Sequence, residues 1–316
     1  MKELRTAVVG VGHLGRFHAQ KYATLPGSRL VAVVDCDLAR AEAVAAELGV
    51  CAYGDYRQSF EQVDAVSIAV PAAAHCEVAS SFLARGIHVL LEKPIATCLK
   101  DADALLELAA RHGATLQIGH LERYNPAVLA LDGVIHEPLF IECHRLFPFR
   151  PRGTDVSVVL DLMVHDIDLV LDLVAAPVAR IDASGAAVVS ADIDIANARI
   201  QFDNGCTANV TASRVSQKTE CKMRIFQRDA YLSLDLHGKR LRVHRRLPGE
   251  AVDGGPLLAT EEPAPGPKDA LRTEISDFLQ CVRESRPPRV GGLQGRRALE
   301  TALVIGRLLG RCPALG

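Results

Sequence analysis

Short apolar runs alternate with longer helix-forming stretches through the first 120 residues of the chain. The apolar runs have no polar face, which is typical of strands buried on both sides, and the stretches between them have the composition of helices. This alternation predicts a parallel sheet covered by helices on both faces. The predicted strands are 7–9, 30–34, 65–70, 88–92 and 116–119, and the predicted helices are 14–25, 38–48, 74–85 and 99–112.

The pattern changes after residue 120. Strand-like runs now follow one another, and some are joined by short turns such as Asp203-Asn204-Gly205 and His237-Gly238, which suit antiparallel hairpins. We therefore predict two domains, 1–120 and 121–316, of which the second is an α+β domain with an open, mostly antiparallel sheet. Its predicted strands are 139–147, 179–189, 193–202, 206–213, 222–226, 230–236 and 240–246, with helices over 155–174, 269–284 and 293–309 and a loop over 248–268.

Three glycines follow the first predicted strand and form the pattern G-x-G-x-x-G. Gly10 permits a tight turn, Gly12 lets a pyrophosphate approach the backbone, and Gly15 lets the next helix pack close to the strand. That helix begins near Leu14, so its N–H groups and positive dipole end face the phosphates. An ordinary glycine turn is the alternative, but the flanking strand and helix favour a Rossmann domain with a doubly wound parallel sheet.

A carboxylate at the end of the second predicted strand indicates which dinucleotide is bound. Asp35 lies twenty residues after Gly15, about where it can accept hydrogen bonds from the adenosine ribose. It would repel the 2′-phosphate of NADP, so we expect NAD, although Arg40 leaves an NADP contact open. The expected cofactor contacts are Gly10, Gly12, His13, Leu14, Gly15, Asp35, Val70, Pro71, His75, Glu92 and Lys93.

Composition narrows the class of protein further. The 316 residues are 49% hydrophobic and 23% charged with a net charge of −2, so nothing favours binding to nucleic acid or to a membrane surface. Nine cysteines without metal-type spacing predict free thiols and no metal site. The chain starts without the apolar core of a signal peptide, and the longest uncharged run, 65–76, is too short to span a bilayer, so we expect a cytoplasmic protein.

Lys93 ends a predicted strand in the sequence Glu92-Lys93-Pro94. The carboxyl ends of parallel strands line the ligand crevice of such sheets, so this ammonium is expected to face the cofactor. Partial burial beside an oxidised nicotinamide lowers the pKa of a lysine and suits it to proton transfer. A surface lysine at a strand end is an equal alternative on position alone.

Asp161 and His165 share one face of the helix predicted over 155–174, because they lie four residues apart. Asp168 and Asp172 continue this polar stripe, and the other faces are so apolar that the helix is expected to be mostly buried. A buried histidine beside a carboxylate is what a general acid or base needs. A solvated edge or a structural Asp–His pair is the alternative.

Polar residues gather after the last parallel strand, where a substrate is expected to lie. A second segment near residue 150 adds two arginines, which suit a diphosphate because they form paired hydrogen bonds, although a solvated loop is a strong alternative for them. The expected substrate contacts are Lys93, Glu122, Arg123, Tyr124, Asn125, Arg150, Arg152 and His165.

Four motifs in this order and spacing resemble the glucose–fructose oxidoreductase / inositol dehydrogenase / MocA (Gfo/Idh/MocA) family. They are Gly10 to Gly15, Val70-Pro71 with His75, Glu92-Lys93-Pro94, and Asp161 with His165. The resemblance covers nearly the whole chain and departs only at Val70, where the family more often has threonine. It implies a nicotinamide-dependent sugar or polyol oxidoreductase with Lys93, Asp161 and His165 around the oxidised carbinol, and an open sheet that makes homodimer or homotetramer contacts.

Within that family, segments 119–126 and 161–168 resemble the branch of UDP-N-acetylglucosamine 3-dehydrogenases. The branch makes a 3-keto sugar that an aminotransferase converts on the way to the 2,3-diamino sugars of lipid A. An inositol or other sugar dehydrogenase, and a non-catalytic sensor of NAD or a sugar nucleotide, stay open as alternatives. For catalysis we expect His165 to be the base and Asp161 to orient its ring or hold a neighbouring sugar hydroxyl. Lys93 is expected to stabilise the alkoxide, with relay of the proton as a further role.

The open face of the second sheet is expected to be covered by another copy of the chain. The apolar residues Ile193, Ile195 and Ile200 are predicted to lie on this face, where exposure would favour burial against a partner.

Overall fold

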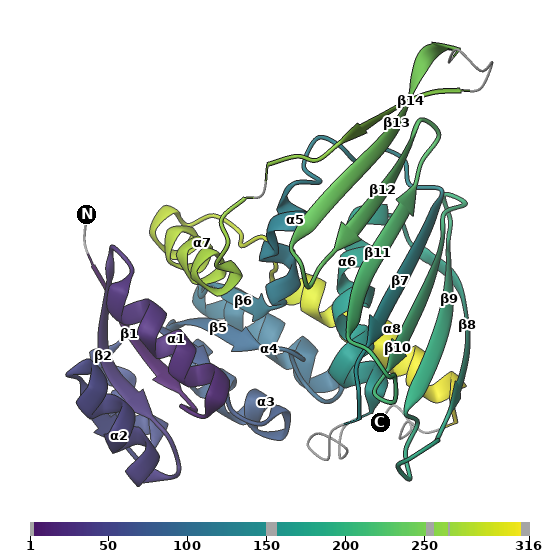
Figure 1. Ribbon diagram of the computed structural model, residues 1–316. Coiled ribbons are helices and arrows are strands. Elements are labelled where there is room, and N and C mark those ends of the chain that lie inside the picture. The colour runs from purple at the N-terminus through teal and green to yellow at the C-terminus, as the bar shows by residue number, and fades with distance from the viewer. Residues whose placement is uncertain (1–2, 150–156, 251–255, 265, 311–316) are drawn as a thin grey trace. The chain divides into compact units, whose positions relative to one another are not determined.

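The computed structural model describes residues 3–149, 157–250, 256–264 and 266–310. These form two compact units, each built around its own sheet (Figure 1). The first unit contains the chain up to Leu121 together with Asp269–Leu299, and the second contains Glu122–Lys268 and the described residues from Glu300 to Gly310. Arg150 and Arg152, which we predicted to bind substrate, lie outside the described residues.

The first unit has a six-stranded parallel sheet in the order β3-β2-β1-β4-β5-β6. The direction of winding reverses between β1 and β4, and ligands of open α/β sheets bind at the carboxyl ends of the strands flanking such a point. The predicted doubly wound sheet is confirmed. Its strands are β1 (Leu4–Val9), β2 (Ser28–Val34), β3 (Cys51–Tyr53), β4 (Ala65–Ile68), β5 (His88–Glu92) and β6 (Leu116–Gly119), and its helices include α1 (His13–Thr24), α2 (Leu38–Leu48), α3 (His75–Leu83) and α4 (Leu99–His112).

Helix α7 (Ala270–Glu284) belongs to the first unit, whereas the sequence analysis assigned all of 121–316 to the second domain. Its apolar face places Ile275, Phe278 and Leu279 in the same buried cluster as Tyr22 of α1 (Figure 1). The first residues of α8 (Gly292–Leu308) also belong to this unit. The chain therefore returns to complete the first core, which the apolar pattern of α7 alone does not reveal.

The second unit is built on an eight-stranded sheet in the order β14-β13-β12-β11-β7-β10-β9-β8. All neighbours are antiparallel except β7 and β10, so the predicted mostly antiparallel sheet is confirmed. Helices α5 (Pro126–Leu129) and α6 (Val164–Val174) pack on it (Figure 1). The strands are β7 (Phe140–Leu146), β8 (Val178–Ala186), β9 (Ile195–Phe202), β10 (Thr207–Ser213), β11 (Glu220–Phe226), β12 (Ala230–Asp235), β13 (Arg240–Glu250) and β14 (Pro256–Glu261).

The outer face of this sheet is more polar than we predicted. In β9 the residues Ala196, Ala198 and Ile200 are fully buried, while Asn197 and Arg199 between them are exposed. The prediction that Ile200 lies on the open face is wrong, because strand alternation directs it into the core with the two alanines. Ile193 precedes the strand and is also buried, so of the three isoleucines only Ile195 shares the register of the outer face.

Strand β14 lies in a segment that was predicted to be a loop, and it pairs with β13 at the edge of the sheet. No helix in the described residues has both the length and the hydropathy needed to cross a bilayer.

Candidate functional site

The glycine loop between β1 and α1 has the shape that a dinucleotide needs. Gly10 has a φ of +84°, and a Cβ there would lie 2.6 Å from the carbonyl oxygen of Ala69. A Cβ at Gly15 would lie 1.8 Å from the carbonyl oxygen of Gly10, so both positions require glycine. At Gly12 a Cβ would meet no atom within 4 Å, which leaves bare backbone facing open space. Gly12 caps α1 without a side-chain bond, so the residues present fit a pyrophosphate at this helix end.

Asp35 is fixed at the end of β2 and faces this loop. Its Oδ2 accepts a hydrogen bond from the backbone N–H of Val11 at 3.0 Å, and its Oδ1 accepts one from the N–H of Asp37 at 3.0 Å. The guanidinium of Arg40 lies against both oxygens. These contacts already use the roughly four acceptor positions of a carboxylate, so a ribose hydroxyl would take a position that Arg40 now holds.

His75 joins the loops that follow β4 and β5. Its Nδ1 lies 2.7 Å from the carbonyl oxygen of Pro94, and its Nε2 lies 2.9 Å from that of Val70. The side chain is 1% exposed, and burial lowers its pKa. These contacts favour a role in holding the two strand-end loops rather than in touching the cofactor directly. Lys93, which precedes Pro94, is half-buried at this edge of the sheet, and Pro71 is exposed there.

Asp161 and His165 are both half-buried in the second unit. Asp161 lies in a π-helical segment, Val159–Met163, and His165 lies in the first turn of α6, which follows directly. Short π-helical turns within helices are frequent at functional sites. Both side chains of this pair belong to the second unit, whereas Lys93 belongs to the first unit.

Arg123 is held inside the second unit by two residues of the predicted polar stripe. Its Nε donates to Asp168 at 2.6 Å, and its Nη1 contacts Asp172. Burial alone would lower the pKa of Arg123, but the two carboxylates raise it overall. The predicted polar stripe therefore has two parts. Asp161 and His165 are half-buried, and Asp168 and Asp172 bind Arg123.

The neighbouring residues Tyr124 and Asn125 are also buried, at 2% and 5% exposure. Asn125 caps α5 by accepting from the N–H of Ala127, and its amide donates to Glu122 and to the carbonyl of Leu236. A substrate contact must be reachable before the substrate binds, so the structure does not favour Arg123, Tyr124 or Asn125 for that role. Glu122 is half-buried.

The sequence analysis missed a buried ion-pair network in this unit. Arg145 of β7 donates from Nε and Nη2 to the carboxylate of Asp166, both at 2.9 Å, and from Nη1 to Glu122 at 3.0 Å. Burial raises the pKa of Asp166 even though contact with Arg145 opposes the rise. A signal was available, since Arg145 occupies a position in β7 that alternation assigns to the core.

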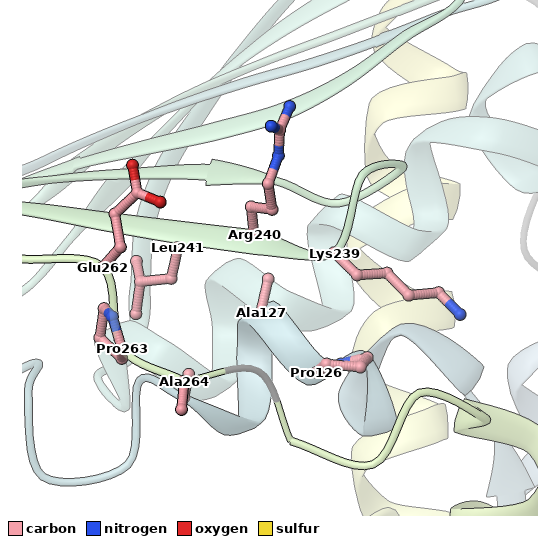
Figure 2. A pocket seen from close by; sticks show the side chains of 9 residues that line it. Pro126, Ala127, Lys239, Arg240, Leu241, Glu262, Pro263 and Ala264 are labelled. Carbon is pink, nitrogen blue, oxygen red and sulfur yellow. The ribbon is translucent and has the colours of Figure 1, made fainter.

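A pocket of ≈ 220 Å³ lies within the second unit between α5, β13 and the chain after β14 (Figure 2). The Nζ of Lys239, on its rim, donates to the carbonyl oxygen of Lys268. Neither Asp161 nor His165 lines this pocket, so it does not supply the predicted chemistry. Its lining residues are Pro126, Ala127, Ala130, Lys239, Arg240, Leu241, Glu262, Pro263 and Ala264.

Comparisons with known proteins agree with this geometry. Residues 4–120 match the model of an oxidoreductase family with an NAD-binding Rossmann fold, and residues 129–239 match the GFO/IDH/MocA C-terminal domain. A UDP-N-acetylglucosamine 3-dehydrogenase from Acidithiobacillus ferrooxidans is 41% identical over 306 residues, covering 96% of this chain and 97% of that protein. A solved structure of that enzyme superimposes with a TM-score of 0.92 and covers 98% of both chains.

A more distant relative is the scyllo-inositol 2-dehydrogenase (NAD(+)) of Bacillus subtilis, which is 26% identical over 95% of this chain and 92% of that protein. The parallel sheet, the glycine loop and Asp35 thus define an NAD-binding oxidoreductase. The chain belongs to the Gfo/Idh/MocA family, and NAD is its cofactor, as the sequence predicted.

Proposed function

We propose that this enzyme oxidises the 3-hydroxyl of UDP-N-acetylglucosamine to the 3-keto sugar with NAD. The observation that carries the proposal is the 41% identity to a UDP-N-acetylglucosamine 3-dehydrogenase along almost the full length of both chains. Inositol dehydrogenases match less well, at 26% identity for the B. subtilis relative. The 3-keto product suits an aminotransferase as the next enzyme, and such a reaction sequence would run in the cytoplasm.

Three residues carry the proposed chemistry. NAD, when bound, accepts the hydride from the sugar carbon. His165 removes the hydroxyl proton, because an imidazole with an unperturbed pKa near 6.5 is largely neutral at pH 7. Asp161 orients His165 or holds a neighbouring hydroxyl, and the ammonium of Lys93 stabilises the negative charge that develops on the oxygen.

The substrate diphosphate is proposed to bind Arg150 and Arg152, whose guanidinium groups suit paired hydrogen bonds to phosphate. Replacing both with glutamine should raise KM for UDP-N-acetylglucosamine while leaving NAD binding intact. Glu122 is the remaining candidate for a polar contact with the sugar. An unchanged KM in the double variant would remove the two arginines from the site.

The test is the formation of NADH from NAD with UDP-N-acetylglucosamine, compared with free N-acetylglucosamine, UDP-glucose and myo-inositol. A carbonyl reagent in the assay traps the ketone, and mass spectrometry of the trapped product gives the position of oxidation. NADH formation with inositol in preference to the nucleotide sugar would support the alternative dehydrogenase. Binding of NAD and sugar nucleotide without turnover would support a sensor.

The chain is further proposed to form a homodimer or homotetramer through the outer face of the second sheet. An aromatic row crosses this otherwise polar face: Phe140 packs against Phe226, which stacks on Tyr231, which stacks on His244. Phe226 is 38% exposed, and aromatic side chains are enriched at protein interfaces. Light scattering should show an oligomer that Tyr231→Arg dissociates, with Leu293→Glu on the exposed start of α8 as control. A monomeric parent protein would refute this.

A further inference from the structure

Two glutamates and a histidine meet inside the first unit, away from the glycine loop. His18 of α1, Glu92 of β5 and Glu274 of α7 bring one ring nitrogen and two carboxyl oxygens within 4.8 Å of one another. Glu274 is 0% exposed, and neither of its carboxyl oxygens has a hydrogen-bond partner in the described residues. Of the three residues, only Glu92 belongs to a sequence motif, where it is an expected cofactor contact, and His18 and Glu274 have no predicted role. A buried carboxyl in this position requires a physical explanation.

Among the described residues, the charged groups that act on Glu274 are carboxylates. The α1 helix presents His18 and Tyr22, β5 presents Glu92, β6 presents Gln117, and α7 itself adds Asp277. Two ionised carboxylates this close, with one of them out of water, are strongly unfavourable, and a group in that position takes up a proton instead. Burial, followed by repulsion from Glu92 and Asp277, raises the pKa of Glu274 well above its ordinary value.

His18 joins Glu92 to a hydroxyl of β4. The Nε2 of His18 lies 3.0 Å from Oε1 of Glu92, and its Nδ1 lies 3.0 Å from the hydroxyl of Ser67. The hydroxyl of Tyr22 lies 2.9 Å from Ser67 and can donate to it in turn. These contacts hold Glu92 against α1 and β4.

We propose that Glu274 is a protonated carboxylic acid that positions Glu92, so that the cluster holds one negative charge at the end of β5, next to Lys93. Glycine at position 119 leaves room for this carboxylate, since a Cβ there would lie 2.8 Å from Oε1 of Glu92. Glu92 is thus confined between β6, His18 and Glu274. An ionised Glu274 would repel Glu92 from this place and disturb the residue that follows it. The effect on catalysis rests on the proposed role of Lys93, whereas the protonation of Glu274 does not.

Infrared difference spectroscopy tests the proton directly. The spectrum of the wild-type protein minus that of Glu274→Gln at pH 7 should contain the carbonyl band of a protonated carboxylic acid. The matched control is Glu284→Gln, which removes an exposed carboxylate from the other end of α7 and should give only an ionised carboxylate band. If Glu274→Gln does not fold, loss of the acid band from the wild-type spectrum on titration to high pH gives the same information. No acid band, with Glu274 ionised, overturns the proposal.

Thermal unfolding gives a second readout. When folding raises the pKa of a carboxyl, the folded chain holds that proton more tightly than the unfolded chain. The free energy of unfolding therefore falls as the pH rises above about 4.3, the pKa of the carboxyl in the unfolded chain. The melting temperature of the Glu274→Gln variant should therefore rise relative to wild type between pH 5 and pH 9, which the Glu284→Gln variant should not do. A difference that stays constant with pH overturns the proposal. Metal analysis gives a second outcome that would overturn the proposal. If the purified wild-type protein contains one equivalent of a divalent metal and the Glu274→Gln variant contains none, a cation neutralises the glutamates in place of a proton.

The catalytic consequence is measured last. Glu274→Gln keeps the neutrality of the acid, so it should lower kcat at pH 7 less than the loss of the Glu92 charge does. Glu92→Gln removes the charge beside Lys93 and should lower kcat by about tenfold or more, equivalent to one pKa unit or 1.36 kcal/mol. If the enzyme has no activity with the proposed substrate, the infrared and thermal results still decide the state of Glu274. A Glu274→Gln variant with the acid band lost but kcat as low as that of Glu92→Gln would overturn the positioning role.

Discussion

Arg40 and Asp35 form a two-point contact at the adenosine end of the glycine loop. Nη1 of Arg40 lies 3.2 Å from Oδ1 and 3.3 Å from Oδ2 of Asp35, and the arginine side chain is about half exposed. The carboxylate therefore restrains a cation that could bind a 2′-phosphate at this position. Preference for NAD then has two sources, namely repulsion by Asp35 and the restraint of Arg40.

Replacing Asp35 with serine should narrow the preference for NAD over NADP. The dissociation constant for NAD should rise about tenfold to a hundredfold, the range for losing hydrogen bonds to a charged group. NADP should bind more tightly because Arg40 is released. Titration calorimetry of the single variant and of Asp35→Ser/Arg40→Ala separates the two sources. Both variants lose the repulsion and should gain affinity for NADP, but the single variant, which keeps Arg40, should gain more. Equal gains in NADP affinity in the single and the double variant would mean that Arg40 does not bind the 2′-phosphate.

The variants Lys93→Met and His165→Ala should each lose turnover while retaining NAD binding. Removing a positioned acid–base group costs about 10²–10⁴ in rate. The measurements are kcat with UDP-N-acetylglucosamine and the dissociation constant for NADH from its fluorescence. Lys100→Met and His237→Ala, both exposed, are the matched controls and should keep the parent rate. A variant that oxidises the substrate at the parent rate excludes that residue from the proposed roles.

Much of the first unit could be predicted because its signals are local. Strands buried on both faces produce continuous apolar runs, and the glycine loop has backbone requirements that only glycine meets, as Gly10 and Gly15 show. Helix α7 could not be assigned from sequence, because periodicity gives the direction of an apolar face but not the sheet against which it packs. Strand β14 was predicted to be part of a loop, because a short strand at the edge of a sheet needs few apolar residues and leaves no clear pattern in the sequence.

The site was predicted less completely than the fold. Lys93, Asp161 and His165 were predicted from position and spacing and stay predictions. The sequence did not show which of the other predicted polar contacts are buried and which are accessible. The sequence predicts that Arg123 contacts a ligand, because it does not show that Asp168 and Asp172 bind the guanidinium inside the unit. Glu274 was missed altogether, because a single glutamate in a helix gives no indication of burial in the sequence. In the structure it is fully buried with Ile275 and Phe278.

The buried contact between Arg123 and Asp168 should contribute strongly to the stability of the second unit. Arg123→Met leaves Asp168 ionised and 2% exposed without its cation, which typically costs about 3–5 kcal/mol. The double variant Arg123→Met/Asp168→Leu should recover most of the loss. Urea unfolding followed by circular dichroism measures both. Arg180→Met breaks an ion pair at the surface and should change nothing measurable. A double variant as unstable as the single one would show that packing, not the unpaired charge, is responsible.

His75 should make the first unit sensitive to acid. A neutral imidazole can donate from only one ring nitrogen, and burial lowers the pKa of His75 although both nitrogens face carbonyl oxygens. Below the unfolded pKa of about 6.5, the unfolded chain takes up a proton that the folded chain resists, so stability falls as the pH decreases. His75→Phe removes this titration and also releases the loops that carry Val70 and Pro94.

The melting temperature of wild type should therefore fall toward that of His75→Phe between pH 7.5 and pH 5.5, while the variant binds NAD more weakly at every pH. His112→Gln, an exposed histidine at the end of α4, is the control and should leave both properties unchanged. Comparison with the variant is essential because burial also lowers the pKa of His88, which contributes to the acid sensitivity of both proteins. A difference in melting temperature that does not change with pH would show that His75 holds the loops by packing and that its protonation plays no part.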